Sequence, residues 1–122
     1  MADKKAILVL EDEDVLSRAL RIALENEGFD VEVVSSGEAA IDKINQSPFD
    51  FFLLDLVIPG IDGFEVLKKI REKNTDALVF VLSNLSDDES KERAKKLGAD
   101  EYFVKSETLL SEISSYIKKR AK

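Results

Sequence analysis

The chain has 122 residues, of which 44% are hydrophobic and 35% charged, with a formal net charge of −7, and this length suits one domain with a sizeable core. Because it holds no cysteine and no histidine, disulfides, thiolate zinc sites, thiol catalysis and any imidazole base, metal ligand or phosphate carrier are excluded. No apolar stretch approaches the roughly 18 residues of a membrane span, and the first residues do not read as a signal peptide, so we expect a cytoplasmic protein without a membrane partner.

The first half of the chain alternates strand and helix patterns. Residues 6–10 form a short apolar run, and apolar residues between 16 and 24 then recur at helical spacing up to Gly28, which suits a helix end. Residues 29–34 alternate and predict a strand at the edge of a sheet. A second helix is expected to begin at Ser36 and Gly37 and to stop before Pro48.

The second half continues the alternation. The unbroken apolar runs 49–54 and 77–82 predict central parallel strands that are covered on both faces, with a helix over 63–73 between them. A fifth strand is expected over 101–104, and a last helix follows with an apolar stripe between residues 109 and 117. Together these elements predict a doubly wound parallel α/β sheet with right-handed crossovers.

The fourth helix has its own signals. Ser86 to Glu89 fits a capping box, so the helix should begin there and end at Gly98. Its interior offers only Ala94 and Leu97 to a core. It is either a weakly held element that is available to move or a well-solvated surface helix.

Four polar residues stand where predicted strands end: Asp12, Asp55, Ser83 and Lys105. Each alone has a structural explanation as a helix cap, a turn residue or a surface lysine. In a parallel sheet, however, the carboxyl ends of the strands share one edge, where ligands gather. We therefore expect these side chains to meet.

The four residues together suit phosphoryl transfer. Asp12 and Asp55 can hold a hard cation such as Mg²⁺, which prefers oxygen ligands. Asp55, at the end of a central strand, can itself accept the phosphoryl group as an acyl phosphate. Ser83 and Lys105 can bind its oxygens, because this reaction needs mainly positioning and charge stabilisation.

Four stretches resemble the receiver domain of two-component response regulators, in particular its single-domain, chemotaxis-regulator-like members. They are residues 7–12, the D-x-x-x-P-x-x-D-G loop at 55–63, residues 81–83 and residues 102–105. The similarity covers essentially the whole chain, 1–122. It implies a flavodoxin-like, doubly wound five-stranded parallel sheet in the order 2-1-3-4-5 with five helices.

The resemblance also implies a metal site and an acceptor. Asp55 would accept the phosphoryl group from a histidine kinase or phosphotransfer protein. Asp12 would bind Mg²⁺ directly, Glu11 would act mostly through a metal-bound water, and the backbone carbonyl of Val57 would complete the protein ligands.

The same resemblance implies a switch. Lys105 would pair with the phosphoryl oxygens, and Ser83 would donate a hydrogen bond to one of them on activation. Tyr102 matches the aromatic residue that turns inward when the hydroxyl moves. Asp62 is expected to cap the third helix rather than to take part in chemistry.

The chain departs from the family pattern at several positions. Ser106 follows Lys105 where the family usually has proline, which calls the cis peptide expected there into question. Asn84 replaces a small residue and could crowd the approach to the phosphoryl group. Val57 and Leu85 are apolar where some relatives carry polar groups, and our hypothesis is that they shield the acyl phosphate and lengthen its lifetime.

The charge distribution bears on the partners. Residues 1–89 hold 9 basic and 20 acidic side chains, net −11, whereas residues 90–122 hold 9 basic and 5 acidic, net +4. The acidic part argues against nucleic acid as a direct partner, and the basic end at 118–122 suits a solvated helix terminus. Basic residues of the fourth helix suit docking of an acidic partner or a second copy; they are Lys91, Arg93, Lys95 and Lys96.

The leading hypothesis is a phosphorylation switch that changes the surface of the fourth helix, fifth strand and fifth helix. The alternatives are a receiver-fold binding module that is not phosphorylated and a flavin carrier of flavodoxin type. An independent turnover enzyme is least favoured. The chain is either a single-domain regulator or a receiver from a longer protein with an output domain, and a monomer or a weak phosphorylation-dependent dimer.

Overall fold

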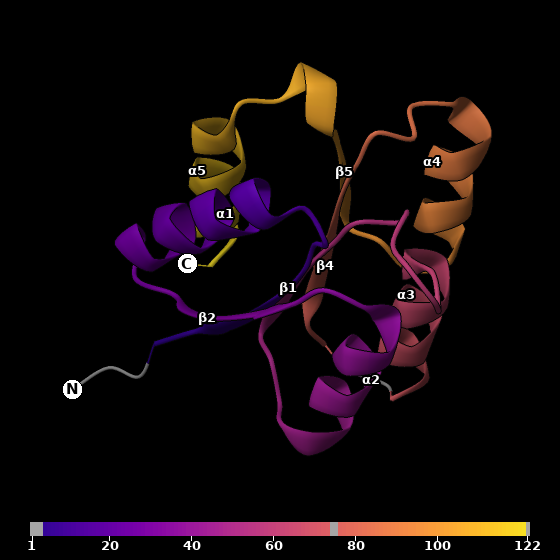
Figure 1. The fold of residues 1–122 in the computed structure, drawn as a ribbon, viewed down its shortest axis with the longest axis horizontal. Helices are drawn as coiled ribbons and strands as arrows, with labels where there is room; N and C mark the ends of the chain where they lie inside the picture. The colour runs from indigo at the N-terminus through magenta and orange to yellow at the C-terminus, as the bar shows by residue number, and fades with distance from the viewer. Residues whose placement is uncertain (1–3, 74–75, 122) are drawn as a thin grey trace.

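The computed structural model describes residues 4–73 and 76–121. They form one parallel sheet in the order β2-β1-β3-β4-β5, with helices on both sides (Figure 1). The predicted fold class and strand order are confirmed, and β2 lies at an edge as expected. The strands are β1 (Ala6–Leu10), β2 (Asp30–Val34), β3 (Phe51–Leu54), β4 (Leu78–Ser83) and β5 (Glu101–Val104). The helices are α1 (Asp14–Asn26), α2 (Gly37–Gln46), α3 (Gly63–Glu72), α4 (Asp88–Lys96) and α5 (Leu110–Arg120), and a short 3-10 turn spans Lys105–Glu107.

The register of the strands aligns their carboxyl ends at one edge of the sheet. Leu10, the last residue of β1, pairs with Leu54, the last of β3, and Ser83, the last of β4, pairs with Val104, the last of β5. The ladder extends one residue further, since the Asp55 amide donates to the Leu10 carbonyl at 2.9 Å. The residues that follow these strands therefore start from fixed, neighbouring positions.

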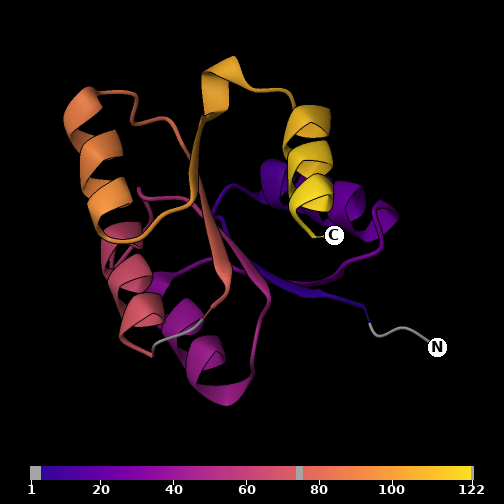
Figure 2. The ribbon, with the colours of Figure 1, turned by 180° about the vertical axis from the view of Figure 1, so that it is seen from behind.

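Helices cover both faces of the sheet. α1 and α5 lie on one face, and α2, α3 and α4 lie on the other (Figures 1 and 2). Every residue of β3 is buried, with Phe52 and Leu54 in the core beside α2 and α3 and with Phe51 and Leu53 in the core beside α1 and α5. Burial on both faces explains why this strand is an unbroken apolar run.

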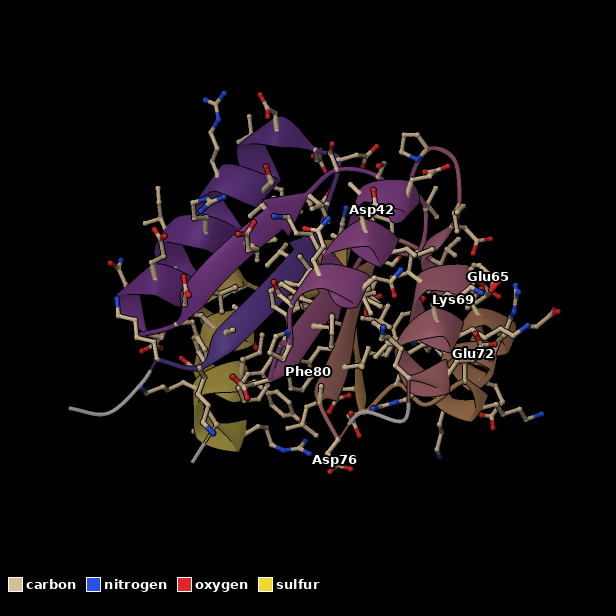
Figure 3. All side chains as sticks on the ribbon, turned by 90° about the horizontal axis from the view of Figure 1, so that it is seen from below. Asp42, Glu65, Lys69, Glu72, Asp76 and Phe80 are labelled. Atoms are coloured by element: carbon tan, nitrogen blue, oxygen red, sulfur yellow. The ribbon has the colours of Figure 1, made fainter. Side chains whose placement is uncertain are left out.

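Aromatic rings pack the core on the α5 side. Phe80 of β4 is fully buried, stacks on Phe51 with ring centroids 6.2 Å apart and meets the Tyr116 ring edge-on at 5.8 Å. Charged side chains such as Asp42 and Lys69 point outward from α2 and α3 (Figure 3). The carboxyl edge of the sheet is the exception to this separation, because acidic side chains are buried there.

Short polar side chains cap α2 and α3, as the sequence predicted. The Ser36 hydroxyl accepts a hydrogen bond from the Ala39 amide at 3.2 Å, and the Asp62 carboxylate accepts one from the Glu65 amide at 3.0 Å. Each bond satisfies an amide that has no partner within its helix. Asp62 is thus the N-cap of α3, at the end of the loop that follows β3.

The expected capping box of α4 is wrong by one residue. The N-cap is Asp87, not Ser86, and its carboxylate accepts from both the amide and the hydroxyl of Ser90 at 3.0 Å. These two bonds lower the pKa of Asp87, and a charged acceptor at a helix N-terminus is favoured over the neutral serine hydroxyl. Of residues 88–96, only Ala94 is buried, which agrees with the few apolar residues that the sequence offered for a core.

Within residues 4–73 and 76–121, no helix has both the length and the apolar character needed to cross a bilayer.

Glycine holds the loop after β3 close to two helix starts. A Cβ at Gly63 would collide with the carbonyl oxygen of Asp55 and lie 2.6 Å from the Cα of Leu56. A Cβ at Gly37, the first residue of α2, would collide with the carbonyl of Ile61. These contacts leave room for hydrogen only, so the backbone beside Asp55 is fixed by the close approach of α2 and α3.

Replacing Gly63 with alanine should destabilise the protein, because the new methyl group overpacks the backbone of Asp55 and Leu56. The expected loss is about 1–3 kcal/mol in the free energy of unfolding, measured with urea. Lys68→Ala, at an exposed position of the same helix, should change it by less than about 0.5 kcal/mol. Equal stability of the two variants would contradict this account of the loop.

Candidate functional site

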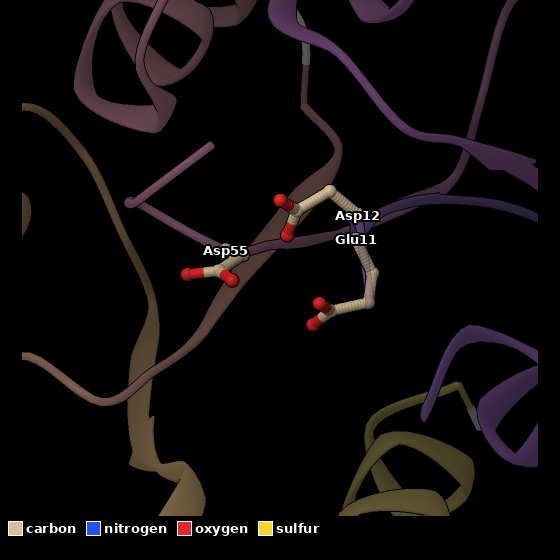
Figure 4. Close-up of side chains that lie close together, drawn as sticks. All are labelled: Glu11, Asp12 and Asp55. Carbon is tan, nitrogen blue, oxygen red and sulfur yellow. The ribbon is translucent and has the colours of Figure 1, made fainter. Parts of the chain in front are cut away.

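Three carboxylates converge at the carboxyl edge of the sheet. Glu11 and Asp12 follow β1, and Asp55 follows β3, so the aligned strand ends place them side by side (Figure 4). One oxygen from each lies within 4.8 Å of the others. Glu11 and Asp55 are only 2% and 4% exposed, whereas Asp12 is exposed. Two buried carboxylates this close require a compensating cation.

Lys105 supplies that positive charge. Its ammonium nitrogen lies 2.8 Å from Asp55 Oδ2, 2.9 Å from Glu11 Oε1 and 3.5 Å from Glu13 Oε2. Burial alone would lower the pKa of Lys105, but the hydrogen bonds to Asp55 and Glu11 outweigh it and raise the pKa above the ordinary value of 10.5. The stabilisation from this pairing is therefore fully present at neutral pH and is lost only as the pH rises past the ordinary lysine range.

The Glu11 carboxyl is in the opposite situation. Burial raises its pKa, with the Asp55 charge adding to the effect, although the Lys105 hydrogen bond and the Glu13 amide act against it. The folded protein thus holds the ionised form of Glu11 less well than water does. Three carboxylates gathered around one ammonium group leave an excess of acidic side chains, which favours a further cation beside them.

The donor set fits a hard divalent cation. Carboxylate oxygens are the ligands that Mg²⁺ prefers, and exposed Asp12 leaves room for the waters that the ion retains. Asp55 Oδ1 also accepts a hydrogen bond from the Val57 amide at 3.1 Å, which holds Val57 against the same carboxylate. The predicted metal residues are thus neighbours in the fold.

Ser83 and Tyr102 both contact the backbone of Leu85. Ser83 is fully buried at the end of β4, and its hydroxyl accepts from the Leu85 amide at 3.3 Å. The Tyr102 hydroxyl donates to the Leu85 carbonyl at 2.6 Å. Burial raises the pKa of Tyr102, and the Asp87 charge adds to the rise, so this hydroxyl keeps its proton as a donor. The two predicted switch residues are joined through the backbone of one residue, Leu85.

Sequence reasoning missed two parts of this site. The first is that the Tyr102 hydroxyl donates to the Leu85 carbonyl. This bond depends on the course of the backbone after β4, which no sequence pattern reveals. Glu13 as a partner of Lys105 was hidden in the acidic run after β1, where each residue also suits a helix start. Within the described residues every peptide bond is trans, including the bond between Lys105 and Ser106.

The chain matches the family model of the response regulator receiver domain over residues 7–118. The chain belongs to this family. This membership sets aside the alternative of a flavin carrier. The receiver-domain family is not a classical enzyme family. The response regulator ArlR of Staphylococcus epidermidis is 33% identical over 117 residues, which are 93% of this chain and 53% of ArlR. The receiver domain thus spans about half the length of the curated relatives that it matches.

Solved structures agree with this assignment. The phosphorylated cyanobacterial phytochrome response regulator RcpA is 29% identical, with a TM-score of 0.83 and coverage of 97% of this chain and 91% of RcpA. A CheY-like receiver domain protein from Methanospirillum hungatei has a TM-score of 0.90, with coverage of 97% and 94%, and at 24% identity it supports the fold alone. The chain is a receiver domain of two-component signalling, a module that works as a phosphorylation switch.

Replacing Lys105 with methionine should destabilise the receiver domain at pH 7. The substitution leaves the buried carboxylates of Glu11 and Asp55 without their cation, and removing one partner of a buried pair costs roughly 3 kcal/mol or more in the free energy of unfolding. Lys96→Met, at an exposed position of α4, should change it by less than about 0.5 kcal/mol. Urea unfolding of both variants without divalent cations checks this, and a stable Lys105 variant would refute the pairing argument.

Proposed function

We propose that this receiver domain accepts a phosphoryl group on Asp55, with Mg²⁺, from a histidine kinase or phosphotransfer protein. The observation that carries the proposal is the Lys105 ammonium on Asp55 Oδ2, 2.8 Å away, beside the carboxylates of Glu11 and Asp12. This arrangement combines a nucleophile, a cation site and a cationic group for phosphoryl oxygens at one edge of the sheet.

The reaction is a displacement at phosphorus. A carboxylate oxygen of Asp55 attacks the phosphoryl group of a phosphohistidine, the phosphorus–nitrogen bond breaks, and the imidazole keeps the electron pair. Lys105 then exchanges the Asp55 oxygen for an oxygen of the phosphoryl group, to which its charge is equally suited. The Val57 amide, 3.1 Å from Asp55 Oδ1, orients the carboxylate before the attack.

The metal would be held by the acids that follow β1 and β3. Asp12 and Asp55 would bind it directly with the Val57 carbonyl, and Glu11 would act through a bound water. When bound, Mg²⁺ supplies positive charge against the phosphoryl oxygens. Apart from its own phosphoryl transfer and dephosphorylation, we assign the domain no turnover reaction.

The phosphorylated state is read through Ser83, Leu85 and Tyr102. The Ser83 hydroxyl accepts from the Leu85 amide at 3.3 Å, so its O–H can still donate to a phosphoryl oxygen, and this long bond resists a movement of the hydroxyl only weakly. A shift of the backbone between β4 and α4 then removes the acceptor of Tyr102, whose ring turns inward. Because α4 buries only Ala94, little packing energy holds it in one position. Phosphorylation can therefore shift the population of conformations of the surface that α4, β5 and α5 form.

The partners follow from this readout. The changed surface would bind a downstream protein or an attached output domain, or a second copy in a weak phosphorylation-dependent dimer. We expect no direct binding to nucleic acid. A cytoplasmic location stays a prediction from the sequence. The alternative is a binding module that is never phosphorylated. The convergence of the carboxylates and the lysine argues against it. Failure of the protein to bind Mg²⁺ would argue for it.

Asp55→Asn should abolish incorporation of a phosphoryl group and binding of the mimic beryllofluoride with Mg²⁺, because an amide oxygen is a poor nucleophile. Asp62→Asn is the matched control in the same loop, since asparagine also caps helices and the Asp62 carboxylate accepts from the Glu65 amide as the cap of α3. Transfer from a labelled phosphodonor measures both variants. Full incorporation by Asp55→Asn would show that the acceptor is wrong.

Val57→Asn combined with Leu85→Glu should speed loss of the phosphoryl group from Asp55. Val57 is an apolar side chain, 58% exposed at the mouth of the site, and polar groups in its place can guide an attacking water. We expect a rate increase on the order of tenfold, about 1.4 kcal/mol in the barrier. Because Leu85 packs against the core, Val57→Asn alone is measured in parallel. Unchanged autodephosphorylation would dismiss the shielding hypothesis.

A further inference from the structure

Glu13 occupies a helix-capping position without capping the helix. It is the N-cap residue of α1, with extended backbone angles, yet its side chain accepts no capping hydrogen bond within the part of the chain that the structure describes. Ser36, Asp62 and Asp87 all cap their helices with their side chains. Serine, aspartate or asparagine would serve this position better than the longer glutamate. The Glu13 carboxylate is therefore free of a capping role and available for another contact.

The side chain reaches across to the end of β5 instead. Glu13 Oε2 lies 3.5 Å from the Lys105 ammonium nitrogen, although the Glu13 side chain is 65% exposed. The Glu13 amide also donates to Glu11 Oε2 at 3.0 Å, which fixes the backbone from which the side chain starts. Among residues 4–73 and 76–121, Lys105 thus has three carboxylate partners, and of these only Glu13 is outside the proposed metal ligands.

We propose that Glu13 is a positioning residue that holds the Lys105 ammonium when a divalent cation is bound by Asp12 and Asp55 beside Glu11. This inference rests on the proposed function and adds a residue to it. A cation at those carboxylates repels the Lys105 ammonium. Glu13 Oε2, only 3.5 Å from that ammonium nitrogen, is then the nearest alternative partner. When a phosphoryl group is present on Asp55, its oxygens must draw Lys105 away from Glu13.

If Glu13 has this role, its removal should change the affinities for Mg²⁺ and for beryllofluoride in opposite directions. Without Glu13, Lys105 has no alternative to Glu11 and Asp55 and competes harder with Mg²⁺, so Mg²⁺ binds less tightly. In the Mg²⁺-saturated protein the same loss frees Lys105 for the phosphoryl mimic, so beryllofluoride binds more tightly. Because Glu13 is largely exposed and screened by water, each change should be roughly two- to fivefold in the dissociation constant.

Three variants separate this role from a general effect of charge. Glu13→Gln removes the charge and keeps the length. Glu13→Asp keeps the charge but is one methylene shorter, so it falls short of Lys105 and suits the helix cap instead. Asp14→Asn removes one charge at the next residue, whose carboxylate pairs with Arg18 at 3.1 Å rather than with Lys105.

The experiment measures Mg²⁺ binding by titration calorimetry, beryllofluoride binding at saturating Mg²⁺, and the NMR signal of the Lys105 ε-methylene in the Mg²⁺-saturated full chain. We expect Glu13→Gln and Glu13→Asp to shift both constants in the stated directions and to move the Lys105 signal. Asp14→Asn should produce less than half of these changes. Urea unfolding of each variant confirms that the fold is retained.

Four results would overturn the inference. If Glu13→Asp behaves like the wild type, or if Asp14→Asn matches Glu13→Gln, Glu13 acts only through its charge and does not hold Lys105. If the wild type binds both Mg²⁺ and beryllofluoride while the variants are unchanged, this inference fails and the proposed function stands. A wild type that binds neither would overturn both.

Discussion

The pairing of one ammonium group with two buried carboxylates is the interaction on which the site depends. Lys105 lies within 2.9 Å of both Glu11 and Asp55, which are almost completely buried where two central strands end. Without a cation these acids could not both stay ionised at this depth. The ammonium group compensates the buried negative charge and, in the proposed reaction, would bind the phosphoryl oxygens. The rest of the sheet serves to hold these three strand ends in register.

The same edge connects the site to the least anchored helix. Ser83 and Tyr102 meet at the backbone of Leu85, just before α4. The far end of α4 is held more firmly, because Arg71 of α3 donates to the Gly98 carbonyl at 2.7 Å and pairs with Asp100 at 3.0 Å. A helix that is fixed after its last turn and lightly packed along its length can respond to a small change at its start. The geometry therefore supports transmission from Asp55 to α4.

The elements could be predicted because their causes are local. Continuous apolar runs marked β3 and β4, and Asp62 marked the start of α3, since burial and capping depend on neighbours in the chain. The strand order and the roles of Glu11, Val57 and Tyr102 came from the family resemblance, whereas the roles of Asp12, Asp55, Ser83 and Lys105 already followed from their places at strand ends. Asp87 could not be distinguished from Ser86 as the cap of α4, because adjacent polar residues differ there only in final geometry. The contact of Glu13 with Lys105 joins residues 92 positions apart and depends on the folded register.

Chemical trapping can identify the residue that carries the phosphoryl group. The receiver domain would be treated with acetyl phosphate and Mg²⁺, reduced with borohydride, which converts an aspartyl phosphate to homoserine, and digested for tandem mass spectrometry. The account predicts homoserine at position 55, formed only when Mg²⁺ is present. Homoserine at another aspartate, or none under conditions where the fold is intact, would contradict the assignment of Asp55 as the acceptor.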